Sequence, residues 1–347
     1  MTHLSSEITA QSAAKEQRAS RRSIPDRLQS PLRRLFNSWE CLLLGVAVAI
    51  FIANAFASPY FLNVWNLSDA TYNFTEKAMI AFAMALLVIA GEIDLSVAAI
   101  IALASTAMGA AAQVGFGTPA LVVIGLGVGL VCGAINGLLV AGLKLPSIVV
   151  TIGTMSLFRG LSYIVLGDKA YGHYPDSFGY FGQGYVVWAF SFEFVLFVLM
   201  ACIFAVVLHA TNFGRQIFVI GNNEFAARFS GIPVERVKFI LFLLTGLMSG
   251  IAGICLTARL GSTRPSIAQG FELEAITMVV LGGVAITGGA GTIGGVVIAA
   301  FVMGLVTFGL GLLNVPGIVM SIFIGLLLIV TIALPILLQR LRHTFGS

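Results

Sequence analysis

Long apolar runs separated by short polar breaks account for most of this chain. A run of ~20 apolar residues is long enough for an α-helix to cross a bilayer. The breaks carry Gly, Pro, Asn and charged residues, which end helices. The pattern predicts an all-α, polytopic membrane protein with about ten spans, at residues 40–57, 75–91, 94–112, 119–142, 147–166, 187–210, 239–258, 274–288, 292–313 and 316–338.

Composition supports a bilayer rather than water as the solvent. Of the 347 residues, 58% are hydrophobic and 10% are charged, whereas soluble domains carry about 25% charged residues. The polarity divides the chain into a disordered basic cytosolic tail at 1–38, a transmembrane domain at 39–338 and a short cytosolic tail at 339–347. A polar segment at 211–238 interrupts the transmembrane domain.

The positions of the basic residues test the predicted topology. Ten spans place both termini on one side of the membrane. Most Lys and Arg residues then fall on that side, in the first tail, the 211–238 segment and the C-terminal end, as the positive-inside rule requires for the cytoplasm. Spans two to five begin outside and spans seven to ten begin inside, which allows an inverted repeat.

The 211–238 segment contains the signals of one short helix. Asn223 is placed to cap a helix over 224–230, Gly231 to end it, and the following proline to prevent its continuation. Glu224 and Arg228 are four residues apart and can form an ion pair on one helix face.

A second face of the same short helix is apolar. Phe225 and Phe229, also four residues apart, form a ridge with Ala226. So short a helix is marginal in water and depends on packing against something else. Two interpretations remain open: a polar linker between spans, or a docking helix that fits a groove on a cytosolic partner.

Glycines concentrate between the eighth and ninth spans. The run at 281–295 includes Gly282, Gly283, Gly288 and Gly289. Glycine weakens a helix by up to ~1 kcal/mol per residue, so in lipid it indicates close packing between helices. The alternative is a mobile hairpin that opens and closes a passage. A phosphate-binding loop is disfavoured, because no Lys follows the glycines and no strand precedes them.

Carboxylates and polar side chains within the spans are candidates for the solute path. Glu92 and Asp94 lie in the turn between spans two and three. The turn is expected to place them at the water boundary, with Asp94 capping the third span, and a proton-coupling role is the alternative. Asn136 and Thr151 can offer hydrogen bonds to a hydroxylated solute or, alternatively, to neighbouring helices and their own backbone.

Enzyme and nucleic-acid functions lack support in the sequence. There is no Walker A or HExxH motif, and the four histidines lie in tails, a loop or a helix end. The four cysteines lie in or beside apolar segments without metal-site spacing. The excess positive charge flanks membrane segments, so it is not a nucleic-acid signature. We expect no cofactor on this chain, and any ATP must bind to another one.

Several stretches together resemble the membrane permease subunits of bacterial ABC importers for sugars. The resemblance covers residues 40–338, and its pieces follow the family's order. They are Gly91–Val97, Asn136-Gly137 with Leu145–Thr151, Gly221–Asn223 through to Ile232, Glu272–Ile276 and the glycine run.

This resemblance implies a set of partners and a role for the central segment. It implies a type II importer fold that dimerises with itself or a related chain, receives sugar from a periplasmic binding protein and rests on two cytosolic ATPases. In such importers the loop between the sixth and seventh helices docks into the ATPase. The coupling candidates are therefore Asn223, Glu224, Ala227, Arg228 and Gly231, with the Phe225 and Phe229 ridge beside them.

One departure from the family pattern bears on the cargo. Glu92 stands where the family usually has the second of two glycines. With Val97–Ala99 following, it favours a rhamnose-type permease over ribose-like or autoinducer sugars. The competing hypothesis is an ion-coupled secondary transporter, which requires carboxylates near the middle of the bilayer.

Overall fold

The computed structural model describes residues 39–167, 169–323, 325–326 and 329. The predicted tails at 1–38 and 339–347, and most of the tenth span, lie outside the described residues. The elements are α3 Trp39–Ala57, α4 Val64–Thr71, α5 Thr75–Ile89, α6 Val97–Gln113, α7 Thr118–Gly137, η1 Leu138–Gly142, α8 Ser147–Leu166, η2 Asp176–Gly179, α9 Tyr180–Gln183, β1 Tyr185–Val187, β2 Phe190–Ser191, α10 Phe192–Ala210, α11 Asn212–Asn222, α12 Glu224–Phe229, α13 Val234–Leu260, α14 Phe271–Leu281 and α15 Ile293–Leu312.

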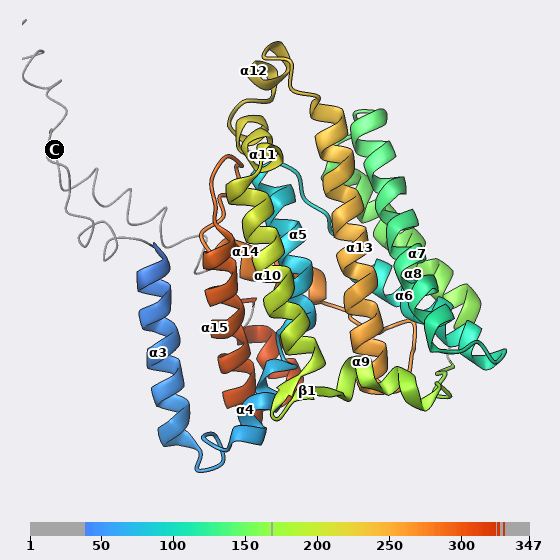
Figure 1. Ribbon diagram of the computed structural model, residues 1–347, viewed down its shortest axis with the longest axis vertical. Helices are drawn as coiled ribbons and strands as arrows, with labels where there is room; N and C mark the ends of the chain where they lie inside the picture. The colour runs from blue at the N-terminus through green and yellow to red at the C-terminus, as the bar shows by residue number, and fades with distance from the viewer. Residues whose placement is uncertain (1–38, 168, 324, 327–328, 330–347) are drawn as a thin grey trace, which may run out of the picture.

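Helix α5 is the centre of the bundle. All of its residues except Lys77 are buried, as expected for a helix that is hydrophobic all round. It packs against α13, α14, α10 and α15, which surround it in Figure 1. The aromatic rings of Phe74, Phe82 and Phe197 fill the space between α5 and α10, with centroids 5.5 Å apart. Movement of α5 therefore affects most of the bundle.

Helices α7 and α13 meet through glycine at unusually short range. Gly129 and Gly133 of α7 face Gly246 and Gly250 of α13. A Cβ atom built on Gly129 would lie 2.4 Å from the Gly246 carbonyl oxygen, and one on Gly246 would lie 2.3 Å from that of Gly129. Small residues of this kind let helix backbones approach in lipid, where packing rather than the hydrophobic effect drives association.

The membrane-span pattern agrees with the sequence in outline. Six described helices are long and apolar enough to cross a bilayer, and a seventh crossing follows if α4 and α5, bent by 41°, count as one. Helix α6 has 17 residues and α14 has 11. The chain is a mostly helical, polytopic membrane protein, while the count of ten spans and the inverted repeat stay predictions.

Several predicted boundaries were wrong for local reasons. The eighth span was expected to continue to 288, but α14 ends at Leu281 because Gly283 adopts φ +84° and turns the chain. The sixth span was expected from 187, but the chain first forms the antiparallel hairpin β1–β2 and α10 begins at Phe192. The all-α description therefore needs this one small hairpin added.

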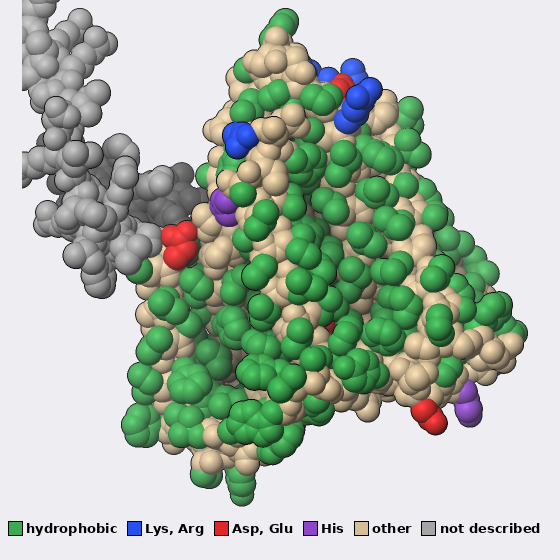
Figure 2. All heavy atoms as spheres, in the orientation of Figure 1, with side chains coloured by type: hydrophobic (Ala, Val, Ile, Leu, Met, Phe, Trp, Pro, Cys, Tyr) green, Lys and Arg blue, Asp and Glu red, His purple; other side chains and the backbone are tan. Residues whose placement is uncertain are grey.

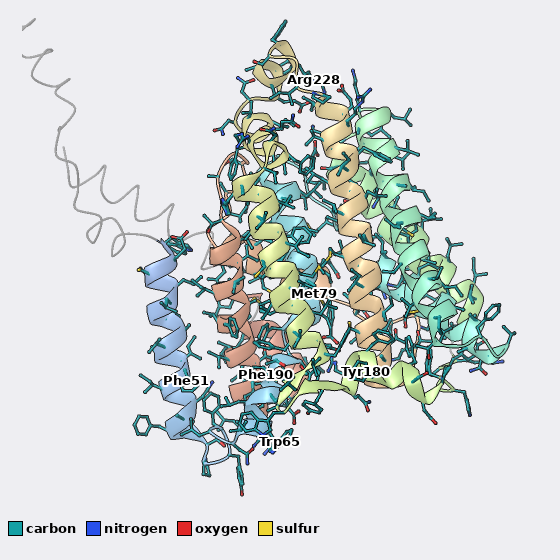
Figure 3. All side chains as sticks on the ribbon, viewed as in Figure 1. Phe51, Trp65, Met79, Tyr180, Phe190 and Arg228 are labelled. Atoms are coloured by element: carbon teal, nitrogen blue, oxygen red, sulfur yellow. The ribbon has the colours of Figure 1, made fainter. Side chains whose placement is uncertain are left out.

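The two ends of the bundle differ in chemistry. Figure 3 places Arg228 at one end and Trp65, Phe190 and Tyr180 at the other. On the face shown in Figure 2, hydrophobic side chains cover most of the surface between the two ends, and basic side chains gather near α12 and the start of α13. We call these the α12 end and the aromatic end. An apolar surface with basic residues at one end and aromatic residues at the other is expected of a membrane-embedded bundle.

Candidate functional site

The polar segment forms two short helices at the α12 end. Helix α11 is capped by Thr211, whose hydroxyl accepts a hydrogen bond from the Gly214 amide at 3.2 Å. Helix α12 is capped by Asn223, whose Oδ1 accepts from the Ala226 amide at 3.0 Å. Gly231, with φ +80°, turns the chain after α12. The predicted cap, short helix and stop are confirmed, with α12 ending at Phe229.

The apolar ridge on α12 faces away from the protein. Phe225 is 78% exposed and Phe229 is 92% exposed. Ala227 is fully buried, so it holds α12 onto the bundle and presents nothing outward. Two adjacent phenyl rings left in solvent on a capped, ordered helix form the kind of exposed apolar feature that marks an interaction surface.

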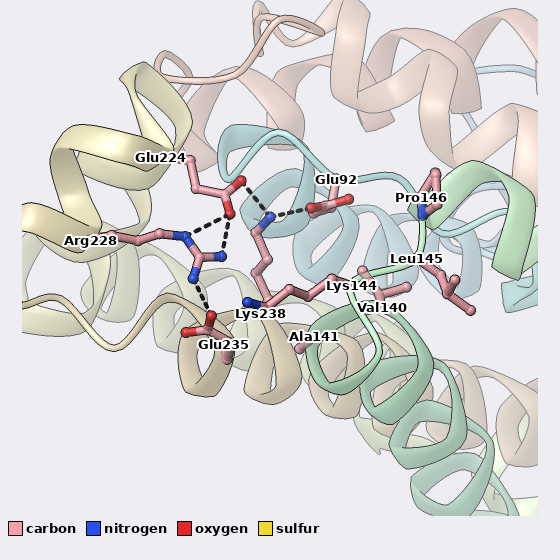
Figure 4. Close-up of a pocket in the computed structure, with 10 residues that line it drawn as sticks. All are labelled: Glu92, Val140, Ala141, Lys144, Leu145, Pro146, Glu224, Arg228, Glu235 and Lys238. Carbon is pink, nitrogen blue, oxygen red and sulfur yellow. Dashed lines mark hydrogen bonds and ion pairs between the residues drawn. The ribbon is translucent and has the colours of Figure 1, made fainter.

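A chain of ion pairs fixes α12 to the bundle (Figure 4). Arg228 pairs with Glu224 at 2.6 Å and also with Glu235 of α13. Lys238 of α13 pairs with the other oxygen of Glu224 at 2.9 Å and with Glu92 at 2.5 Å. These groups line a cavity of about 260 Å³ together with the turn that contains Lys144 and Pro146. The sequence predicted only the Glu224–Arg228 pair.

The ion pairs set the charge state of Glu224. Its partial burial alone would raise the pKa of its carboxyl group, but hydrogen bonds from Lys238 and Arg228 and the positive charges of both residues outweigh this. The pKa of Glu224 is consequently lowered below its usual value. The carboxylate stays ionised throughout the physiological range.

Asp94 corrects an expectation from the sequence. It was expected at the water boundary, but it is fully buried. Its Oδ1 accepts from the Ser96 amide at 2.9 Å and the Ser96 hydroxyl at 2.7 Å, and its Oδ2 accepts from the Thr245 hydroxyl at 3.0 Å. Asp94 was also expected to cap the third span, but Ser96 is the N-cap residue of α6; Asp94 lies two residues earlier and accepts from Ser96, while Thr245 ties the same carboxylate to α13. Glu92 is also largely buried, with 13% of its side chain exposed.

The two polar candidates from the spans have different surroundings. The amide of Asn136 donates to the Ser96 hydroxyl at 2.8 Å, which joins α7 to the Asp94 cluster, and its Oδ1 is buried without a partner. Thr151 instead donates to the Ser147 carbonyl one turn earlier in its own helix at 2.8 Å. The structure therefore places Asn136 beside Asp94, and it satisfies the hydroxyl of Thr151 within α8.

The glycine run forms a tight, closely packed turn. Gly283, Gly288 and Gly289 all have positive φ, which only glycine adopts without strain. A Cβ atom on Gly282 would lie 2.6 Å from the Val296 amide nitrogen. The Gly289 amide donates to the Ile89 carbonyl at the end of α5 at 2.9 Å. Packing therefore explains these glycines, and a gating motion of the run stays a prediction.

Comparison with known protein families identifies the chain. Residues 66–332 match the family described as the permease component of the branched-chain amino acid transport system. The match covers most of the chain, including the ion-pair chain, α12 and the glycine run. The chain belongs to this permease family. No solved structure matches it significantly.

Relatives of the permease are similar over nearly their whole length. It is 36% identical to the L-arabinose transport system permease protein AraH of Escherichia coli over 304 residues, 87% of this chain and 92% of that protein. It is 34% identical to the ribose import permease protein RbsC of Bacillus subtilis, over 89% of this chain and 97% of that one. It is 31% identical to the autoinducer 2 import system permease protein LsrD of Photorhabdus temperata, over 85% and 90%.

Sequence reasoning missed a second cluster of charges, near the aromatic end of the permease. Arg259 donates to both oxygens of the fully buried Glu76, at 2.8 and 3.1 Å. Glu193 is buried nearby and accepts from the Thr75 hydroxyl at 3.1 Å. These residues lie near the ends of apolar runs that are far apart in the chain, so only the fold could bring them together. The described residues hold no group of His, Cys, Asp and Glu suited to a metal ion.

Arg159 of α8 also finds its partners through the fold. Its guanidinium donates to the carbonyl oxygens of Pro265 and Ile267 at 2.7 and 2.8 Å. The side chain therefore ties α8 to the segment before α14. It orders an irregular stretch of backbone, whose carbonyl oxygens would otherwise lack partners.

Proposed function

We propose that this permease forms the membrane path of an ATP-driven importer that moves a monosaccharide across the bacterial inner membrane. The relatives named for L-arabinose, ribose and autoinducer 2 support a sugar-type cargo. The chain itself binds no cofactor in this proposal, and ATP is hydrolysed by separate subunits.

The observation that carries the proposal is the geometry of α12. A helix of six residues has little stability of its own in water, yet α12 is capped at both ends and joined to α13 by two ion pairs, Arg228 with Glu235 and Glu224 with Lys238. Its two phenyl rings point outward. An apolar ridge on a helix that ion pairs fix in place is suited to insertion into a groove of a partner protein. We assign the partner as the ATPase and α12 as the docking helix.

The docking helix sets the orientation and the working cycle. It places the α12 end in the cytoplasm, together with the chain termini, and the aromatic end at the periplasm, where a sugar-binding protein delivers the cargo. Two permease subunits, identical or related, each contribute one α12. When ATP draws the ATPases together, the two docking helices approach each other and tilt the bundles between inward and outward openings.

The identity of the sugar is a separate proposal. None of the three relatives above is named for rhamnose, whereas Glu92 and the Val97–Ala99 segment favour a rhamnose-type permease. Calorimetry on the binding protein that co-purifies with the permease distinguishes the cargoes, with L-arabinose, D-ribose and L-rhamnose as titrants. Micromolar or tighter binding of one sugar alone assigns it.

Buried carboxylates keep a second candidate function open. Asp94, Glu76 and Glu193 are all fully buried, and buried acidic residues of membrane proteins are typical of ion-coupled transport. However, Asp94 accepts three hydrogen bonds and Glu76 pairs with Arg259. Both carboxylates therefore have structural partners, which favours the ATP-driven proposal.

Charge reversal on α12 tests the proposed function. Arg228→Glu places like charges beside Glu224 and Glu235 and disturbs the docking surface. We expect the variant to insert into the membrane, because an exposed ion pair contributes only about 0–1 kcal/mol to stability, and to lose both ATPase co-purification and sugar uptake. Arg236→Glu, on an exposed site of α13, is the matched control. Normal ATPase binding and uptake by Arg228→Glu would refute the assignment of α12.

A further inference from the structure

Lys238 lies between two carboxylates from different parts of the chain. Its ammonium is 2.9 Å from Glu224 on α12 and 2.5 Å from Glu92 in the turn between α5 and α6. Figure 4 shows the lysine reaching up from α13 with one carboxylate on each side. Only 10% of the lysine side chain and 13% of the Glu92 side chain are exposed, so little water screens this contact.

Burial makes the charges of Lys238 and Glu92 depend on each other most strongly, because the Glu224 side chain is 37% exposed. Removing one member of a buried ion pair leaves an uncompensated charge, which is far more costly than losing an exposed pair. Glu92 forms its ion pair with Lys238. A displacement of the ammonium group is therefore transmitted to the turn that contains Glu92. Glu224 holds the ammonium from the other side and is itself fixed by Arg228.

The turn that contains Glu92 is a junction of the bundle. Two residues further on, Asp94 binds Ser96 at the start of α6 and Thr245 of α13, and Ser96 accepts from Asn136 of α7. Two residues before Gly91, the Ile89 carbonyl accepts from Gly289 of the glycine run. A displacement of this turn therefore reaches α5, α6, α7, α13 and the loop before α15.

No other ion pair among the described residues joins α12 to this turn. Arg228 connects α12 to Glu235 of α13, and none of the ion pairs given for the described residues joins either of them to the turn between α5 and α6. Arg228 therefore attaches α12 to α13, while Lys238 also links α12 to the turn between α5 and α6 at the centre of the bundle. Helix α11, which precedes α12, also packs against α5, with Gly221 close to the Ile89 carbonyl.

We propose that Lys238 is the positioning residue that carries the movement of α12 into the turn between α5 and α6, by holding Glu224 and Glu92 on one ammonium group. This role rests on the proposed function, since it requires that α12 be moved by an ATPase. In the absence of the ammonium, the ATPase still binds α12 and still hydrolyses ATP, but the helices that line the path no longer follow.

The test measures sugar transported per ATP hydrolysed. The full complex of permease, ATPase and binding protein is reconstituted into proteoliposomes, and the probe is whichever of labelled L-arabinose, D-ribose and L-rhamnose the wild-type complex takes up. We expect Lys238→Met to hydrolyse ATP at the wild-type rate while uptake per ATP falls about tenfold, within the range of typical allosteric coupling. Lys238→Arg, which keeps the positive charge, should retain most of the wild-type uptake per ATP.

Two further variants keep the test decisive. Glu92→Gln removes one partner of the lysine with almost no change of shape, and it replaces Lys238→Met if that variant does not fold. Arg236→Met removes a cation two residues away on the same helix, where it is exposed, and keeps the wild-type ratio. A purely structural role would lower the yield and the thermal stability of the Lys238 and Glu92 variants but leave uptake per ATP unchanged.

The outcomes separate this inference from the function on which it rests. Without ATP-driven uptake by the wild-type complex, the proposed function itself fails. If the wild-type complex transports sugar, and Lys238→Met or Glu92→Gln transports it with the wild-type ratio, the role of Lys238 is overturned while the importer assignment stands. If uptake per ATP falls as far in Arg236→Met as in Lys238→Met, the proposed role of Lys238 is likewise overturned.

Discussion

Replacing Gly246 by alanine tests whether the contact between α7 and α13 is as close as the structure shows. The added Cβ would lie 2.3 Å from the Gly129 carbonyl oxygen and 2.7 Å from the Gly133 Cα atom. Because Cβ atoms essentially never come within 3.0 Å of such neighbours, the two backbones must separate locally by about 0.7 Å or more. Separations of that size remove a quarter to a half of the dispersion energy of the affected contacts.

The magnitude follows from two opposing effects. Overpacking of a close contact costs about 1–3 kcal/mol, and replacing glycine by alanine within a helix returns up to about 1 kcal/mol. We therefore expect Gly246→Ala to lower the free energy of unfolding by about 1–2 kcal/mol. Gly127→Ala is the control, since it lies on α7 with open space around its Cβ position, and it should be neutral or slightly stabilising.

The assay is unfolding of the purified permease in mixed micelles, with helicity as the signal and both variants measured beside the wild type. The comparison between the two alanine variants removes the contribution of helix propensity, which they share. Equal stabilities of Gly246→Ala and Gly127→Ala, within about 0.5 kcal/mol, would refute the close contact between α7 and α13.

Three further predictions concern the α12 end. Phe225→Ala and Phe229→Ala should leave the free energy of unfolding within about 0.5 kcal/mol of the wild type, since both rings are exposed. Each should weaken binding of the ATPase by about 2 kcal/mol, which calorimetry with the purified ATPase measures. Unchanged affinity would contradict the docking ridge. The lowered pKa of Glu224 means that its contribution to holding α12 is complete above about pH 4.3, its pKa when unfolded, and is lost as pH falls through the lower folded-state value. A spin label on α12 should thus stay immobile from pH 8 to about 5. An increase in its mobility near pH 6 would contradict this prediction. Asp94→Ala leaves the buried Ser96 amide and hydroxyl without their acceptor and should cost about 1–3 kcal/mol per unsatisfied group; a thermal melt like that of the wild type would contradict its place in the core.

Local signals predicted the elements that depend on local chemistry. The cap at Asn223, the stop at Gly231 and the Glu224–Arg228 pair all lie within nine residues of sequence, and the structure confirms each one. Apolar runs likewise predicted α3, α8, α15 and the combined length of α7 and η1 to within one residue of their ends. These features need no information about which helices are neighbours.

The contacts that tie the site together could not be predicted from the sequence. Lys238 and Glu92 are 146 residues apart, and nothing near either one indicates the other. Asp94 likewise accepts a hydrogen bond from Thr245 of α13, which is 151 residues away in the chain. One missed feature did have a local signal: glycines recur every four residues at 125, 129, 133 and 137, the spacing that places them on one helix face.

The energy source of uptake tests the central claim most directly. Cells that express the permease with its ATPase and binding protein are given a labelled sugar that the wild-type system accepts, under two treatments. A protonophore collapses the proton gradient, arsenate depletes ATP, and cellular ATP is measured under both treatments. The account predicts that uptake persists with the protonophore and stops with arsenate. Uptake that stops with the protonophore while cellular ATP stays at its normal level would contradict the ATP-driven mechanism and favour ion-coupled transport.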